Sequence, residues 1–184
     1  MIKFFLRMLP AMLASVLASA APPAWDFTRP QPDWNSQRNL TASSSKEGLL
    51  LDVTDYDSNL GNDRVQIDPA QYSRVRIVYS AEGFSAPTNG ELFFAGKSNP
   101  EFADSRSFQI PSLTADGKIH TLTLDVNHNI NAGSGQWSEE KLVTRLRLDL
   151  VNQFPGKILL KSLEFLPGAP APVNSLNETN ITQG

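Results

Sequence analysis

The sequence of 184 residues contains no cysteine and only two histidines, His120 and His128. Without cysteine there can be no disulfide bond, no cysteine nucleophile and no lipid-modified cysteine. Two histidines leave few members for a Ser-His-Asp triad or a zinc site, and no GxSxG segment or phosphate-binding glycine loop is present. The 19 acidic residues still allow a glycosidase-like carboxylate pair, but no pair stands out, so an enzymatic function is not favoured.

Basic residues are also few. Lysine and arginine number 16 against 19 aspartates and glutamates, which gives a formal net charge of −3. A nucleic-acid-binding protein carries a basic patch or stripe. No such stripe is visible in the sequence, and we expect no nucleic-acid partner.

Long apolar runs are lacking as well, and the longest stands near the N-terminus. Lys3 and Arg7 lead into an apolar run from Met8 to Ala20, which ends in the small-x-small pattern Ala-Ser-Ala that signal peptidase cleaves. This run is well short of the roughly 20 residues that span a bilayer. We predict a cleaved signal peptide at residues 1–20, a periplasmic or secreted protein, and no membrane span in the mature chain. An uncleaved anchor is the alternative.

The remainder of the chain predicts one domain and a tail. Residues 168–184 are rich in Pro, Asn, Ser and Thr and show no hydrophobic periodicity, which is typical of a flexible segment. Residues 21–167 have the usual size of a single domain, about 100–150 residues.

Short runs that alternate apolar and polar residues recur along this domain, bounded by Gly, Pro, Asn or Asp. They are AWDFT, EGLLLDVT, DRVQID, YSRVRIVYS, GELFFAGK, SRSFQIP, GKIHTLTLDV, TRLRLDL and KILLKSLEFL. No window shows a convincing helical stripe. We therefore predict an all-β fold, a two-sheet antiparallel β-sandwich of jelly-roll type with about nine strands.

Alternation within the run at residues 144–150 places leucines on one side of the strand and charges on the other. The charged side chains are Arg145, Arg147 and Asp149. Residues 73–80 and 119–126 alternate in the same way, so the three strands, if adjacent, would form one patch of Arg, Thr and Asp. This patch is either a solvated face with ion pairs worth about 0.2–1 kcal/mol each, or a concave face that binds sugar hydroxyls. The sequence leaves both open.

Two aromatic residues, Trp34 and Tyr56, stand among polar neighbours in loop-like segments. An exposed ring in such surroundings is typical of a binding site, and the apolar C–H face of a sugar stacks on an aromatic ring. In the alternative, Trp34 covers an edge of the sandwich and Tyr56 hydrogen-bonds a turn. The remaining strand aromatics are predicted to be core residues: Trp25, Phe27, Phe93, Phe108 and Phe165. Trp137 is predicted to close one end of the core.

The segment DGKIHTLTLDV, followed by Trp137 and then by LVTRLRLDLVNQFPGKILLKSLEF, resembles the C-terminal part of galactose-binding-like jelly-roll domains of bacterial exported proteins. The matching positions are Asp116, Gly117, His120, Trp137, Leu146, Arg147, Asp149, Pro155 and Gly156. The similarity extends from Trp25 to Leu166 and is most specific in its last third. Such domains are frequently glycan-binding modules of polysaccharide-active proteins, and some are structural. The resemblance implies a carbohydrate-binding-module-like sandwich with a polysaccharide or oligosaccharide as partner.

Many carbohydrate-binding jelly rolls hold a structural calcium between an acid on the first strand and an aspartate on the last. Here Lys161 and Ser162 occupy the corresponding part of the last strand, so Asp26 lacks an obvious partner. The loop TDYDSNLGND offers oxygen ligands but lacks the distal glutamate of an EF-hand loop; its candidate ligands are Asp55, Asp57, Asn59 and Asp63. We predict no cofactor, with a structural calcium as the less favoured alternative.

Two functions follow from these observations. The first is an exported, non-catalytic glycan-binding module that acts on or with an envelope or extracellular polysaccharide. Its candidate ligand-binding residues are Trp34, Tyr56, Arg145, Arg147 and Asp149. The alternative is a structural or adaptor protein of the envelope, which binds a protein partner and has no affinity for sugars.

Overall fold

The computed structural model describes residues 21–87, 89–126 and 137–168. The predicted signal peptide, His128 and residues 169–184 of the predicted tail lie outside the described residues. Within the described ranges, no helix has both the length and the apolar character needed to cross a membrane.

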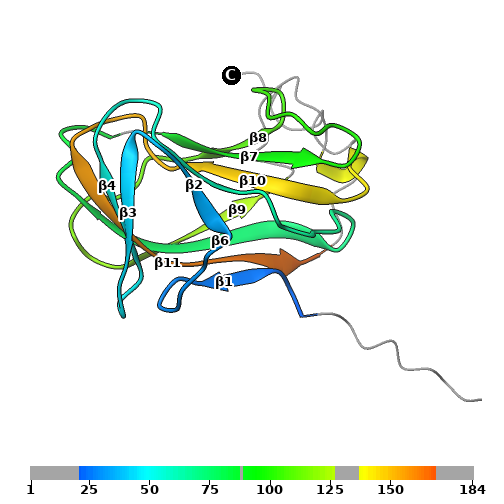
Figure 1. The fold of residues 1–184 in the computed structure, drawn as a ribbon, viewed down its shortest axis with the longest axis horizontal. Coiled ribbons are helices and arrows are strands. Elements are labelled where there is room, and N and C mark those ends of the chain that lie inside the picture. The colour runs from blue at the N-terminus through cyan, green and yellow to red at the C-terminus, as the bar shows by residue number, and fades with distance from the viewer. Residues whose placement is uncertain (1–20, 88, 127–136, 169–184) are drawn as a thin grey trace, which may run out of the picture.

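The described chain forms two antiparallel sheets packed face to face, which confirms the predicted all-β sandwich (Figure 1). The strands are β1 (Ala24–Asp26), β2 (Trp34–Arg38), β3 (Leu40–Ser44), β4 (Leu49–Val53), β5 (Asn59–Asn62), β6 (Tyr72–Glu82), β7 (Gly90–Gly96), β8 (Ser107–Ile110), β9 (His120–Asp125), β10 (Val143–Asp149) and β11 (Gly156–Pro167), with a short 3₁₀ helix η1 (Trp137–Glu139) before β10. The six-stranded sheet has the order β3-β4-β11-β6-β9, with β1 also paired to β11. The five-stranded sheet has the order β2-β5-β10-β7-β8.

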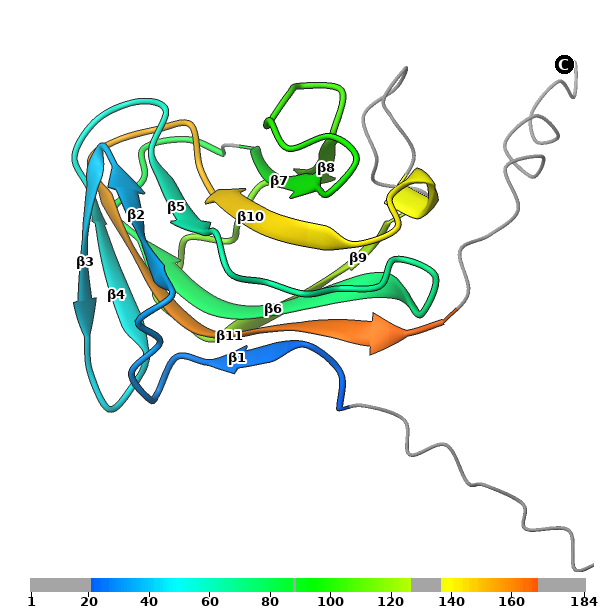
Figure 2. The ribbon, with the colours of Figure 1, turned by 45° about the vertical axis from the view of Figure 1, so that its right-hand side comes forward.

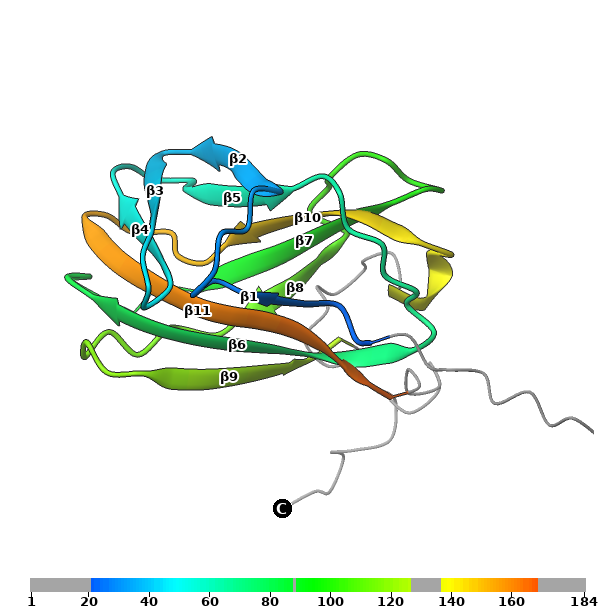
Figure 3. The same cartoon turned by 60° about the horizontal axis from the view of Figure 1, so that its bottom comes forward.

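Strand β11 is the centre of the six-stranded sheet, as Figure 3 shows. One edge of β11 pairs with β6. The other edge pairs first with β4 and then with β1. A register shift at Lys161 inserts one extra residue, so the inward side chains are Ile158 and Leu160 before it and Leu163 and Phe165 after it. This bulge lets a long strand keep apolar side chains in the core on both sides of a bend.

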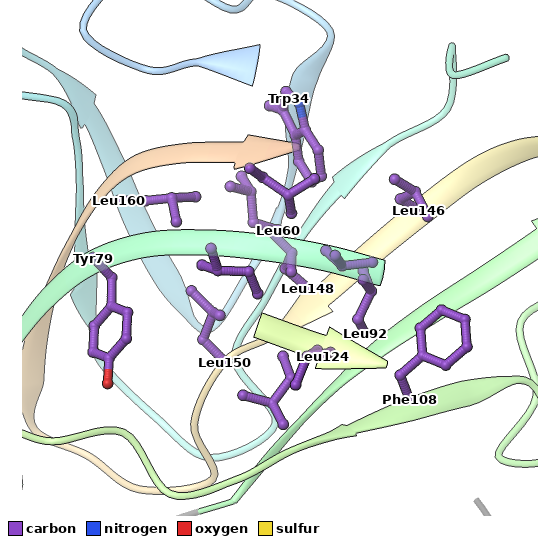
Figure 4. Packing of buried hydrophobic residues seen from close by; sticks show 14 of the residues in the cluster. Trp34, Leu60, Tyr79, Leu92, Phe108, Leu124, Leu146, Leu148, Leu150 and Leu160 are labelled. Carbon is purple, nitrogen blue, oxygen red and sulfur yellow. The ribbon is translucent and has the colours of Figure 1, made fainter. Parts of the chain in front are cut away.

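The core lies between the sheets, and Figure 4 shows the leucines of β10 at its centre. Side chains of a strand alternate between its two faces, and Leu146 and Leu148 are accordingly almost fully buried. Trp137 is 1% exposed, donates its indole N–H to the Tyr72 carbonyl oxygen at 2.9 Å, and stacks on Phe165 at 5.5 Å between ring centroids. Its predicted packing role is therefore confirmed.

The strand count differs from the expected nine because polar segments form strands too. The segments of β2, β3 and β5 are short and largely polar or interrupted by glycine, and their extended form depends on pairing with neighbours rather than on alternation. Conversely, the predicted strand at residues 63–68 contributes only an isolated bridge between Ile67 and Val143.

The conditional patch of arginine, threonine and aspartate does not form. Strands β6 and β9 are neighbours in the six-stranded sheet, whereas β10 is the middle strand of the five-stranded sheet. Their polar faces therefore point to opposite sides of the sandwich. On the β6 side, Arg76 pairs with Glu164 of β11.

Candidate functional site

The outer face of the five-stranded sheet carries the predicted charges of β10. The antiparallel register places Arg147 opposite Phe93 of β7, and Asp149 opposite Glu91 of the same strand. Glu91 is in turn opposite Gln109 of β8. Because directly opposite residues on one face of a sheet are close neighbours, these five side chains form two adjacent rows across β10, β7 and β8.

The first row is built around an arginine lying on an aromatic ring. The Arg147 guanidinium carbon is 4.1 Å from the Phe93 ring centroid. Its Nε and Nη2 atoms donate to the two carboxylate oxygens of Asp149 at 2.9 and 2.8 Å. A planar guanidinium on a ring face, joined to a carboxylate by two hydrogen bonds, has a defined orientation. The ion pair therefore joins two residues of the same strand.

Phe93 corrects one sequence prediction. It is buried, at 3% exposed, yet it belongs to the outer face and not to the hydrophobic core. Phe93 and Phe94 are consecutive on one strand, so only one of them can face inward. Phe94 takes the core position, and the Phe93 ring is covered from outside by Arg147.

The β7–β8 loop, residues 97–106, covers one end of this face. The Phe102 ring centroid lies 4.6 Å from the Arg145 guanidinium carbon and 5.5 Å from that of Arg147. Arg145 also donates to the Pro100 carbonyl oxygen at 2.9 Å and to a carboxylate oxygen of Asp63 at 2.7 Å. Arg145 is therefore engaged by protein groups at the covered end.

The other end of the face is open and forms a cavity of about 420 Å³. Its lining consists of carboxylates, amides and a few apolar groups: Asp57, Asn89, Gly90, Glu91, Gln109, Asp149, Val151 and Asn152. Several of these groups are held in place. Glu91 accepts hydrogen bonds from Ser107 at 2.8 Å and from Gln109 at 3.4 Å, and Asp57 pairs with Arg38 at 3.1 Å.

Asp149 connects the covered and the open parts of the face, and its electrostatics are unusual. The pKa of Asp149 is raised to about 6; burial is the largest cause, and the negative charges of Asp57 and Glu91 act in the same direction. The hydrogen bonds and positive charge of Arg147 oppose this rise only in part. A carboxyl group that titrates this close to neutrality is typical of functional sites.

Two exposed aromatic rings belong to residues that adjoin the cavity lining in the sequence. Tyr56 is 59% exposed and Phe154 is 39% exposed, and their centroids are 4.7 Å apart at an interplanar angle of 89°. Tyr56 directly precedes Asp57, and Phe154 follows Asn152 by two residues, so both adjoin residues of the cavity lining. Figure 1 shows the β4–β5 and β10–β11 loops that carry them at the same end of the sandwich.

Of the two interpretations of Trp34, the structure contradicts an exposed loop residue and agrees with a residue that packs at an edge of the sandwich. Trp34 begins β2, is 4% exposed, and meets Trp25 and Phe27 edge to face at centroid distances of 5.4 and 5.7 Å. Its ring faces the space between the sheets, because the polar neighbours in the sequence occupy the outward positions of an edge strand. Trp34 lines a separate cavity of about 260 Å³ and does not adjoin the one at Asp149.

A metal site is not apparent in residues 21–87, 89–126 and 137–168, where no group of three or more His, Asp or Glu side chains could hold an ion. The Asp26 carboxylate instead accepts hydrogen bonds from the Thr28 hydroxyl at 2.6 Å and the Thr28 backbone N–H at 3.0 Å, which lower its pKa. His120 lies on the other sheet, where its hydrogen bond to Asp116 at 2.7 Å lowers the pKa of the latter.

The predicted residues thus separate into three places. Asp149 lines the cavity and is held by Arg147, and Tyr56 directly precedes a residue of the cavity lining. Arg145 lies beneath the β7–β8 loop. Trp34 lies in the core. Sequence reasoning missed a second set of residues: Asn89, Glu91, Phe102, Gln109, Asn152 and Phe154. The alternation in GELFFAG and the isolated ring in NPEFAD were available signals for Glu91 and Phe102.

Comparison with known proteins gives a fold relationship. No protein-family model and no curated protein matches the chain. Among solved structures, a family 29 carbohydrate-binding module has a TM-score of 0.51 at 10% identity, covering 79% of this chain and 90% of that one. A variant of such a module has a TM-score of 0.53 at 10% identity, covering 80% and 92%. A further variant, in complex with cellulohexaose, has a TM-score of 0.51 at 10% identity, covering 80% and 93%. The chain therefore has a carbohydrate-binding-module-like fold.

Proposed function

We propose that this protein is an exported, non-catalytic carbohydrate-binding module that acts on or with an envelope or extracellular polysaccharide. Its glycan site is the open half of the outer face of the five-stranded sheet, at the cavity beside Asp149. The predicted signal peptide supports export, and the carbohydrate-binding-module-like fold supports the ligand class.

The observation that carries the proposal is the fixed Arg147–Asp149 pair at the cavity. Sugar hydroxyls donate and accept hydrogen bonds, and neighbouring hydroxyls of one ring suit planar carboxylate, amide and guanidinium groups. Here such groups are already held by Phe93, Ser107 and one another. Side chains that are fixed before binding lose little conformational entropy when the ligand arrives, which favours affinity.

Tyr56 and Phe154 supply the apolar part of the site. Ligand sites commonly combine aromatic side chains with a few convergent polar groups. The exposed ring of Tyr56 can receive the C–H face of a pyranose, and Phe154 supports that ring from the side. The side chains of the cavity then reach the hydroxyls at the rim of the same sugar.

The charge of the cavity lining should discriminate between uncharged and acidic glycans. Three carboxylates, those of Asp57, Glu91 and Asp149, line the cavity, and no basic side chain is among its lining residues in the described chain. A uronate or a sulfated sugar would place like charge beside them, which disfavours binding. We therefore expect uncharged glycans to bind better than acidic ones.

The test is a glycan array probed with the chain lacking residues 1–20, followed by titration calorimetry on the best glycan. We expect binding to uncharged glycans, unaffected by a calcium chelator, and a loss of at least about tenfold in Tyr56→Ala, the size typical of a contributing aromatic contact. Ile119→Ala, which removes an exposed apolar residue from the other side of the sandwich, is the matched control. A blank array, or equal binding by Tyr56→Ala, would reject the proposal.

A further inference from the structure

The outer face of the five-stranded sheet is divided along the direction of β10. At the Arg145 end, Phe102 lies over Arg145 and Arg147. At the Asp149 end the same face is hollow. The Arg145 and Arg147 side chains beneath Phe102 keep 33% and 27% exposure, so the first half is covered in part. Figure 2 shows the β7–β8 loop and the β10–β11 loop at opposite ends of this sheet.

The covering loop is fixed by a buried acid. Glu140, at 3% exposed, pairs with Arg106 and accepts hydrogen bonds from the Asn99 amide at 2.7 Å and the Ser98 backbone N–H at 3.4 Å. Both charges of the Glu140–Arg106 pair are buried, and separating them would leave an uncompensated charge in the interior. The Lys97 N–H also bonds to the Leu142 carbonyl oxygen at 3.0 Å. These contacts hold both ends of the loop and so position it as a wall of the site.

We propose that the site binds a short oligosaccharide or the end of a glycan chain and does not accommodate a long chain lying across the sheet. The inference rests on the proposed function and adds to it the mode of recognition. The sugar enters beside Tyr56 and Phe154, occupies the cavity at Asp149, and is stopped by Phe102.

Two further observations support this mode. The cavity volume, about 420 Å³, is near the lower limit of small-molecule sites. Beyond the cavity, the Arg145 and Arg147 guanidinium groups already bond to Asp63, Pro100 and Asp149 and lie against Phe102, so a longer chain would have to displace these contacts to extend over this half.

The test is a length series, from disaccharide to hexasaccharide, of cello- and manno-oligosaccharides and of the best glycan from the array, measured by titration calorimetry. We expect affinity to reach its plateau early, with less than about a threefold gain from trisaccharide to hexasaccharide, because added units contact only solvent. A soluble polysaccharide of the same linkage, which has few ends, should bind more weakly per sugar unit than the disaccharide.

Phe102→Ala is the decisive variant, because it removes the stop and leaves the cavity lining intact. We expect it to gain affinity for the hexasaccharide and to leave disaccharide affinity unchanged. Phe102→Leu, which keeps an apolar cover, is the matched control. If the alanine variant unfolds, the length series on the unmodified protein remains the test. Stepwise gains through the hexasaccharide in the unmodified protein would overturn the inference and leave the proposed function standing. An absence of binding by every member of every series would instead overturn the proposed function.

Discussion

The raised pKa of Asp149 predicts a pH dependence of stability that one substitution should remove. The carboxyl has a pKa of about 6 in the folded protein against 3.8 in the unfolded chain. Between these values the folded state binds the proton more tightly than the unfolded state. The group's stabilising contribution is therefore complete below about pH 4 and is lost as the pH rises through 6. In Asp149→Asn the side chain is always neutral, and this loss disappears.

The size of the effect follows from the same two values. A difference of about 2 in pKa corresponds to about 3 kcal/mol. The Asp149 side chain retains 16% exposure, so screening by solvent reduces the expected change to about 1–2 kcal/mol.

The measurement is urea unfolding at pH 4, 5, 6 and 7 for the unmodified protein, Asp149→Asn and Asp52→Asn. Asp52 is exposed on the outer face of the other sheet and provides the same substitution away from the cavity. The unmodified protein should lose about 1–2 kcal/mol relative to Asp149→Asn as the pH rises from 4 to 7. A constant difference between the two proteins, or one of opposite sign, would refute the reasoning.

Three further predictions concern stability in urea. Arg147→Ala leaves the largely buried Asp149 carboxylate without its partner and should lower the free energy of unfolding by about 1–3 kcal/mol. Arg74 is an exposed arginine on the other sheet, and Arg74→Ala should change the free energy of unfolding by less than about 0.5 kcal/mol. Trp137→Ala should cost about 3–5 kcal/mol and remove near-UV circular dichroism; near-native stability would show that Trp137 does not help to build the core. Gly48→Ala should lower the free energy of unfolding by more than about 1 kcal/mol, because φ at Gly48 is +147° and the new Cβ would lie 2.5 Å from a carbonyl oxygen of β11. Gly83→Ala should lower it less, because the nearest atom to its new Cβ would be 3.4 Å away.

Local alternation predicted the strands with strong patterns and missed those without them. In β10 the inward leucines and outward charges are readable because the side-chain period of two is a property of the strand itself. Strand β5 contains Gly61 and lies within TDYDSNLGND, which the sequence predicts to be a loop; its extended form depends on pairing with β2 and β10. Pairing between distant segments leaves little local trace in the sequence.

The site was predictable in part for the same reason. The outward orientation of Arg147 and Asp149 follows from the pattern of their own strand. The neighbours that give Asp149 its raised pKa do not, since Glu91 reaches it through the β7–β10 register and Asp57 through the β4–β5 loop. Trp34 was misplaced because an edge strand with polar outward residues resembles a loop.

The place of β11 in the six-stranded sheet has a consequence for when the chain can fold. Strands β4, β6 and β1 all hydrogen-bond to β11, so before residues 156–167 are available this sheet consists only of the separate pairs β3–β4 and β6–β9. Contacts between residues far apart in sequence form slowly and late. The domain should therefore stay unfolded on the ribosome until its last strand has emerged, which is the condition in which a chain can be threaded through a translocation channel.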